Sequence, residues 1–120
     1  MILAVNDVDA SVAFYTDVLG CTHDGSDGPF EVVRFTDDFM ILLAAAETDG
    51  GQHLAFETSR EEFEEIWARL KERRLEYGDS FHNVGSMTGP GRERGAHGIG
   101  PALYFWDPSR HLLEIRYADA

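Results

Sequence analysis

The sequence contains little cysteine and no long apolar run. Cys21 is the only cysteine among 120 residues, so no disulfide can form within the chain. A single free thiol fits a reducing compartment. No segment approaches the roughly 18 apolar residues that cross a bilayer, and the first residues lack the basic and apolar regions of a secretory signal. We therefore expect a cytoplasmic protein with no membrane partner.

Positive charge is also scarce. The chain has 10 Lys and Arg residues against 22 Asp and Glu residues, which gives a net charge of −12. Nucleic acid is bound largely through Lys and Arg contacts to phosphate, so we expect no nucleic-acid partner. Solubility is the simple interpretation of this excess, and steering of a cationic ligand is the alternative. The sequence also lacks a Ser-His-Asp pattern, a phosphate-binding glycine loop and zinc-finger spacing.

Two segments have the signals of amphipathic helices. The run from Val8 to Leu19 repeats apolar residues at helical spacing, and Gly20 follows it as a stop signal. The second helix starts at a capping box, with Ser59 at the cap and Glu62 three residues later. Its apolar stripe consists of Phe63, Ile66, Trp67 and Leu70.

The remaining apolar segments predict strands. They are Phe30–Thr36, Phe39–Ala45, Gln52–Glu57, Leu75–Phe81, Ala102–Trp106 and His111–Tyr117. The segment from Asn83 to Gly100 contains six glycines and predicts a long loop. Such a loop is either a lid over a pocket or a plain connection.

The order of these elements indicates an internal duplication. Leu3-Ala4-Val5 aligns with Leu54-Ala55-Phe56 at an offset of 54 − 3 = 51 residues, and the apolar positions of the two helices then coincide. We therefore predict an α+β fold of two βαβββ modules, about 1–48 and 49–120. At 120 residues both modules fit within a single domain, 1–120.

A histidine and a glutamate lie on unusual strand positions. Side chains alternate along a strand, so His53 and Glu114 both face away from the helix-packed side of their predicted strands. A buried glutamate is costly unless it is paired, hydrogen-bonded or bound to a metal. An ion pair between Glu114 and Arg116 is one explanation, and a hydrogen-bonded core histidine at position 53 is another. Metal ligation by His53 and Glu114 is the functional interpretation.

Three segments resemble one family over nearly the whole chain. They are Val5–Gly20, His53–Phe56 and Leu103–Ile115, the last of which contains Trp106-Asp107-Pro108 followed by His111-Leu112-Leu113-Glu114. In these the chain resembles the vicinal oxygen chelate superfamily, which contains glyoxalases, fosfomycin-resistance enzymes, extradiol dioxygenases and bleomycin-resistance proteins. The resemblance implies a glyoxalase-like pair of βαβββ modules forming a cup-shaped mixed sheet, a homodimer and a small-molecule substrate or ligand.

The resemblance also implies metal ligands. Members with a catalytic divalent metal (Zn, Ni, Mn or Fe) use a histidine on the first strand, a histidine matching His53 and a glutamate matching Glu114. The first position has no counterpart, because Ile2 aligns with His53 in the repeat. Three explanations remain open: a histidine upstream of Met1, a third ligand from His82 or His97, or a metal-free site.

Further residues complete the predicted site. Tyr104 and Trp106 would either pack in the core, as aromatic residues on strands usually do, or line the cup and stack on a ligand. Arg116 and His97 would contact the substrate. Glu114 would be catalytic as a metal ligand. The prediction is a metal-dependent enzyme of lyase, isomerase, thiol-transferase or dioxygenase type. The alternative is a metal-free small-molecule or antibiotic-binding resistance protein of the same fold.

Overall fold

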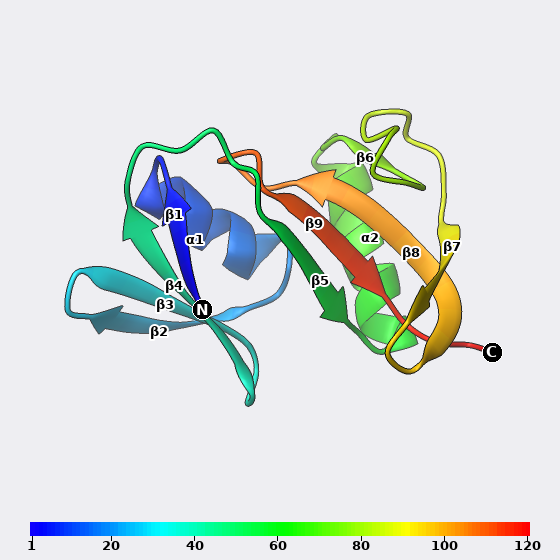
Figure 1. Ribbon diagram of the computed structural model, residues 1–120, viewed down its shortest axis with the longest axis horizontal. Helices are drawn as coiled ribbons and strands as arrows, with labels where there is room; N and C mark the ends of the chain where they lie inside the picture. The colour runs from blue at the N-terminus through cyan, green and yellow to red at the C-terminus, as the bar shows by residue number, and fades with distance from the viewer. The chain divides into compact units, whose positions relative to one another are not determined.

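The fold consists of two units with the same plan. The computed structural model describes residues 1–120 and contains two helices and nine strands (Figure 1). The first unit comprises residues 1–50 and 107–110, and the second comprises residues 51–106 and 111–120. Neither helix has the length and apolar character that a bilayer span requires.

The first unit is a four-stranded sheet with one helix. Its elements are β1 (Ile2–Val5), α1 (Val8–Asp17), β2 (Thr22–Asp27), β3 (Phe30–Thr36) and β4 (Phe39–Ala45). The strand order is β1-β4-β3-β2, with β1 parallel to β4 and the other pairs antiparallel. The bounds of β3 and β4 are those predicted from their apolar runs.

The second unit repeats this arrangement with one edge strand divided in two. Its elements are β5 (His53–Glu57), α2 (Arg60–Glu72), β6 (Tyr77–Gly78), β7 (Gly91–Gly95), β8 (Gly98–Trp106) and β9 (Leu112–Arg116). The order is β5-β9-β8-β6, and β7 also pairs with β8. Strands β6 and β7 therefore occupy successive parts of one edge of β8, where β2 pairs with β3 in the first unit.

The strand register confirms the predicted duplication. In the first unit Ile2 pairs in parallel with Leu42, and in the second His53 pairs in parallel with Leu112. Ile2 and His53 therefore hold equivalent positions, at the offset that the sequence alignment gave. The α+β class and the two βαβββ modules are both correct.

Helix α1 ends earlier than predicted. Asp7 caps it by accepting the Ala10 N–H at 3.0 Å, but the last helical residue is Asp17 and not Leu19. The chain turns off the helix because Gly20 adopts a left-handed backbone with φ of 85°. Gly20 was predicted to be the stop, and only the final two residues of the helix were placed wrongly.

Helix α2 forms as its sequence signals predict. The Ser59 hydroxyl accepts the Glu62 N–H at 3.0 Å, and the Glu62 carboxylate accepts the Ser59 N–H at 2.8 Å. Phe63, Ile66 and Leu70 are buried. The rings of Phe63 and Tyr117 meet edge to face, with centroids 5.2 Å apart, so the helix packs on the sheet near the end of β9.

Three strands differ from the prediction. No strand was predicted for the segment of β2, and β7 was placed in a loop, since both segments are rich in Gly and charged or polar residues and poor in β-branched residues. The predicted loop 83–100 contains all of β7 and the start of β8, which form a hairpin through Gly95 and Gly98. Conversely, the strand predicted for Leu75–Phe81 is reduced to the two residues of β6. In each case pairing with β3 or β8 outweighs local propensity.

The turn 107–110 belongs to the first unit. The Arg110 N–H donates to the Asp107 carbonyl at 3.1 Å, which closes the turn between β8 and β9. The buried Tyr15 hydroxyl donates to Asp107 Oδ2 at 2.8 Å, and the Ser109 N–H donates to Asp107 Oδ1 at 2.8 Å. The Asn6 N–H donates to Ser109 Oγ at 3.0 Å. Helix α1 and the end of β1 thereby hold the turn in place.

Candidate functional site

One face of the second sheet carries the ionisable residues. In the strand register, Glu114 of β9 pairs with Ala55 of β5 on one side and with Tyr104 of β8 on the other. His53 of β5 pairs with Leu112, which lies two residues before Glu114 on β9. Paired residues point to the same side of a sheet, and so do residues two apart in one strand. His53, Glu114 and Tyr104 therefore share a face. The opposite face is apolar and buried: Leu54, Phe56, Leu113 and Ile115.

His53 and Glu114 are in direct contact. His53 Nε2 lies 3.1 Å from Glu114 Oε1. The histidine side chain is 51% exposed, whereas the glutamate side chain is only 9% exposed. A carboxylate this buried requires a partner, and the imidazole is its partner here. The same two groups are common ligands of divalent metals. The structure thus brings the two predicted ligands together on adjacent strands.

Tyr104 lies beside this pair. Its ring centroid is 6.2 Å from that of His53, and the residue is buried. Burial raises the pKa of the Tyr104 phenol, and the nearby carboxylates of Glu114 and Glu93 raise it further. The phenol therefore stays protonated near neutral pH and can donate a hydrogen bond. Glu93 comes from β7, which the sequence assigned to a loop, so its approach to Tyr104 was not predicted.

Arg116 is almost completely enclosed. The residue is 3% exposed, and its guanidinium donates to three acceptors. Nε donates to Glu57 Oε1 at 2.9 Å, Nη1 to the Glu93 carbonyl at 3.1 Å and Nη2 to the Gly98 carbonyl at 2.8 Å. Its Nη1 lies 4.0 Å from Glu114 Oε2, which is the ion pair considered from the sequence. The guanidinium thus points into the protein and not toward solvent.

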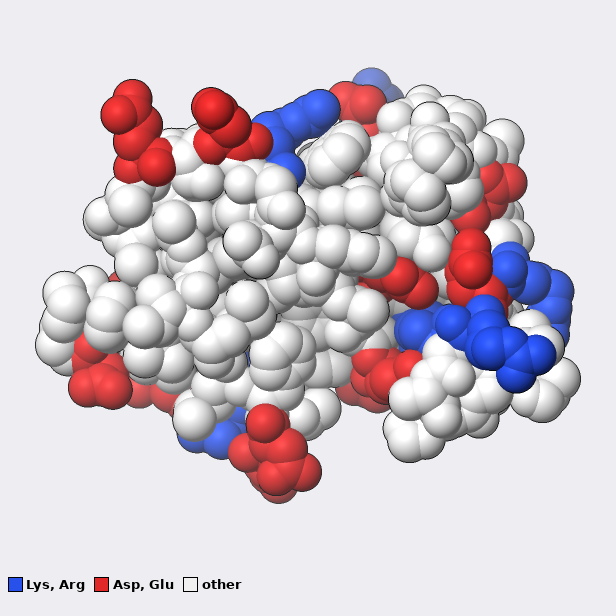
Figure 2. Space-filling model, viewed as in Figure 1, with Lys and Arg blue, Asp and Glu red and all other residues white.

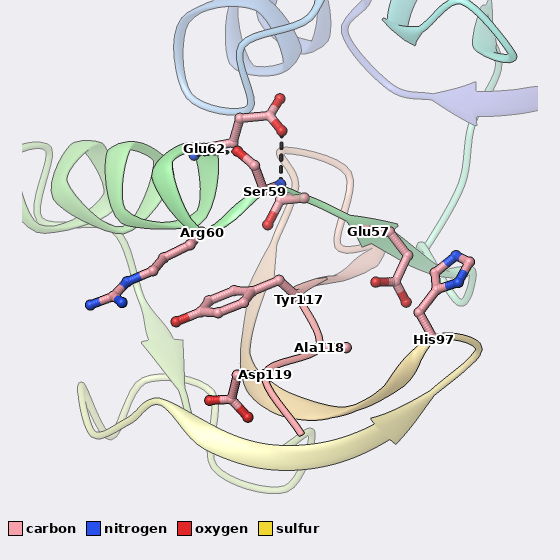
Figure 3. A pocket seen from close by; sticks show the side chains of 9 residues that line it. Glu57, Ser59, Arg60, Glu62, His97, Tyr117, Ala118 and Asp119 are labelled. Carbon is pink, nitrogen blue, oxygen red and sulfur yellow. Dashed lines mark hydrogen bonds between the residues drawn. The ribbon is translucent and has the colours of Figure 1, made fainter.

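A cavity of about 710 Å³ lies at the end of β5. The start of α2, the β7–β8 turn and the C-terminal segment complete its wall (Figure 3). His97 lies next to Glu57 on one side, and the ring of Tyr117 lies toward Arg60 on the other. The predicted substrate contact His97 therefore lines a cavity in the second unit, beyond Arg116 on the sheet.

The other candidate residues are dispersed. Trp106 is half-buried on β8, opposite Leu112. His82 is exposed, with its ring 3.8 Å from that of Phe81. Cys21 is buried, and burial raises the pKa of its thiol to about 12, so it is no activated thiolate. Over residues 1–120, no three His, Cys, Asp or Glu side chains gather closely enough to hold a metal ion.

Charges of opposite sign gather around β7. Figure 2 shows basic side chains beside acidic ones over this part of the molecule, whereas the face over β1 and β4 is largely uncharged. One of the pairs in the second unit is Arg92 with Asp119, which holds the pKa of that carboxyl below its usual range. Despite the net charge of −12, basic and acidic side chains therefore lie next to one another in this part of the second unit.

Comparison with protein families places the chain. The model of the Glyoxalase/Bleomycin resistance protein/Dioxygenase superfamily matches residues 1–115. The chain belongs to this superfamily. No curated protein matches the sequence significantly.

Solved structures agree with this assignment. Oxidase ChaP-H1 superposes with a TM-score of 0.82 at 29% identity, covering 99% of this chain and 93% of that one. Oxidase ChaP-H2 gives a TM-score of 0.82 at 28% identity, covering 99% and 91%. The fosfomycin resistance protein FosX from Mesorhizobium loti has a TM-score of 0.69 at 15% identity, covering 99% and 89%, which supports the fold alone. The resemblance inferred from the sequence is thus confirmed.

Within this superfamily fold, the sequence predicted which candidate residues share a strand face better than which residues the hairpin brings to them. It identified His53, Glu114 and Tyr104, which the structure brings together. It missed Glu93, because β7 gives no strand signal beyond a Gly-Arg-Glu-Arg-Gly alternation. It also placed His97 in a long loop, whereas the structure places it at the turn of the β7–β8 hairpin.

Proposed function

We propose that this protein is a metal-dependent enzyme acting on small molecules, with His53 and Glu114 as two of the metal ligands. The contact between His53 Nε2 and Glu114 Oε1 at 3.1 Å carries the proposal. One ligand is half exposed and the other almost buried. A ligand can therefore reach the site from solvent beside His53, whereas Glu114 is enclosed by the protein.

The donor chemistry of the pair suits a divalent cation. Imidazole nitrogen and carboxylate oxygen bind Zn, Ni, Mn and Fe. Two protein ligands hold a metal less tightly than the three that are usual in catalytic zinc sites, so water or substrate completes the coordination. When bound, such a metal supplies Lewis-acid stabilisation of negative charge on substrate oxygens.

The surrounding residues have defined roles in this proposal. Tyr104 donates a hydrogen bond to an oxygen of the substrate, since its phenol remains protonated. Trp106 provides an apolar surface for stacking. His97 binds a more distant part of the substrate, at the cavity beyond Arg116. The family resemblance implies a homodimer, and we propose this as the active form. The molar mass measured by light scattering after size-exclusion chromatography tests it.

Oxidase chemistry is the reaction class we favour. The two oxidases ChaP-H1 and ChaP-H2 resemble the chain at 29% and 28% identity over nearly its full length. Lyase, isomerase, thiol-transferase and dioxygenase chemistry rest on the superfamily alone, and a shared fold does not fix the reaction.

Metal binding by chelator-treated protein tests the proposal. The wild type should bind a single Mn, Fe, Ni or Zn ion, measured by titration calorimetry and elemental analysis. His53→Ala and Glu114→Gln should each weaken binding by about 100-fold or abolish it, because each removes one of two ligands.

His23→Ala is the matched control. His23 Nε2 also lies close to a glutamate, 2.9 Å from Glu31 Oε1, but in the first unit. This variant should bind metal as the wild type does. Equal affinity in the wild type, His53→Ala and Glu114→Gln would contradict the proposal.

A metal-free binding protein is the second candidate. It is favoured by the direct hydrogen bond between His53 and Glu114, which satisfies both groups without a metal. It predicts that the chain binds a small molecule, such as a cationic antibiotic, with the same affinity before and after chelator treatment. Absence of metal binding in every titration would select this candidate.

A further inference from the structure

A buried arginine connects three elements behind the His53–Glu114 pair. Arg116 follows Glu114 by two residues on β9 and is therefore on the same face of the sheet. It donates to the side chain of Glu57 on β5, to the backbone of Glu93 on β7 and to Gly98 at the start of β8. An arginine whose role is to bind a substrate keeps N–H groups of its guanidinium free for that substrate. In Arg116, by contrast, each of the three guanidinium nitrogens already donates to an acceptor within the protein.

The β7–β8 hairpin lies directly on this guanidinium. A Cβ added at Gly95 would come within 2.3 Å of both Cζ and Nε of Arg116. Gly95 has no left-handed backbone, so the reason for glycine here is space and not conformation. Any side chain at this position would displace the guanidinium or lift the hairpin.

The two oxygens of Glu114 face different partners. Oε1 lies 3.1 Å from His53 Nε2, and Oε2 lies 4.0 Å from Arg116 Nη1. Rotation of the carboxylate plane away from this orientation would lengthen both contacts at once, because each oxygen would leave the line to its partner. Because the guanidinium is fixed by three other acceptors, it favours one orientation of the carboxylate.

We propose that Arg116 is a positioning residue that keeps the Glu114 carboxylate turned so that Oε1 meets His53. It also fastens the hairpin that brings Glu93 to Tyr104. The importance of this orientation for catalysis rests on the proposed function, in which Glu114 is a metal ligand. The orientation itself does not depend on a metal and is tested without one.

The main test uses the ring nitrogens of the histidines in metal-free protein. Long-range ¹H–¹⁵N correlation spectra report the hydrogen bonding of each imidazole. Glu114→Gln defines the His53 signal without a charged partner. Arg116→Met and Gly95→Ala should both move the His53 signal toward that value, whereas Arg116→Lys, which keeps the charge, should move it less. The His23 signal should not change, since Glu31 remains its partner.

The outcomes decide the proposal even if one variant does not fold. Gly95→Ala keeps every charge and adds one methyl group, so it covers the case in which Arg116→Met unfolds. Circular dichroism identifies the folded variants. A folded Arg116→Met or Gly95→Ala protein with the wild-type His53 signal would overturn the proposal.

Metal binding supplies a second readout that separates the two proposals. If the wild type binds metal, Arg116→Met should weaken binding about 10–100-fold, the usual effect of losing a partner of a ligand, and Arg116→Lys should recover most of it. If no variant binds metal while the His53 signal still moves, the proposed function fails and the positioning role stands. A wild-type metal affinity in folded Arg116→Met would overturn the positioning role.

Discussion

Removal of one hydroxyl group should measurably destabilise the first unit. Tyr15 is fully buried, and its hydroxyl donates to Asp107 Oδ2 at 2.8 Å. Tyr15→Phe keeps the ring and its edge-on contact with Phe14 at 5.6 Å, but it takes a donor from a carboxylate that is only 3% exposed. The Ser109 N–H remains as a partner of Asp107, so the loss is partial.

The magnitude follows from the charge of the acceptor. A hydrogen bond to a charged group contributes about 1.5–3 kcal/mol, so we expect Tyr15→Phe to lower the free energy of unfolding by about 2 kcal/mol at pH 7. For a domain of this size the midpoint temperature should then fall by about 8 °C. Circular dichroism follows the unfolding of the wild type and of Tyr15→Phe. Unfolding in urea gives the free energy of unfolding, and unfolding by heat gives the midpoint temperature.

Alkaline pH provides an independent check of the same contact. Burial, and then the charge of Asp107, raise the pKa of the Tyr15 phenol above its usual value. Above pH about 10 an unfolded tyrosine releases its proton while the folded one keeps it, so wild-type stability falls by about 1.4 kcal/mol per pH unit. Tyr15→Phe lacks this loss. The difference between the two proteins should therefore shrink above pH 10 and vanish near about pH 11.5.

Tyr117→Phe is the control for this experiment. The Tyr117 ring lies in the wall of the cavity, so loss of its hydroxyl should change the free energy of unfolding by less than about 0.5 kcal/mol. The reasoning is refuted if Tyr15→Phe also stays within about 0.5 kcal/mol of the wild type at pH 7. It is equally refuted if the difference between them stays constant up to pH 11.

Two further predictions concern backbone space and thiol burial. A Cβ at Gly50 would lie 2.2 Å from the Arg110 carbonyl, while one at Gly51 meets nothing within 4 Å, although both have positive φ. Urea unfolding should show a loss of about 1 kcal/mol for Gly51→Ala and at least about 2 kcal/mol more for Gly50→Ala; equal losses would contradict this. Because burial raises the pKa of Cys21 to about 12, about one thiol in ten thousand is ionised at pH 8. A disulfide reagent should therefore label it only as fast as the protein unfolds, and prompt labelling without urea would show that the thiol is exposed.

Elements with strong local signals could be predicted from the sequence. Strands β3 and β4 are two runs rich in apolar and β-branched residues separated by a two-residue turn, and their bounds were correct. The capping box fixed the start of α2. Strand β2 could not be predicted, since Thr22–Asp27 is almost entirely exposed and contains Gly, Ser and Asp. Its strand structure results from pairing with β3, a contact that local propensity does not encode.

The candidate site was predictable where it depends on alternation along single strands. The faces of β5 and β9 follow from the apolar residues next to His53 and Glu114, and parallel pairing of the two strands then brings these side chains together. Enclosure of Arg116 was not predictable, because it depends on the hairpin that Gly95 allows to lie on the guanidinium. From the sequence alone, a substrate contact and an ion pair with Glu114 were both reasonable for this residue.

The duplication places different side chains at equivalent positions of the two units. The register that pairs Ala55 with Glu114 in the second sheet pairs Ala4 with Ala44 in the first. The position equivalent to His53 is Ile2, which is 61% exposed. The same backbone arrangement therefore presents an imidazole and a carboxylate in one unit and two apolar side chains in the other. Because both sheets form with the same strand order, this strand arrangement does not require the polar pair, and Glu114 is buried in the second sheet with His53 and Arg116 as its partners.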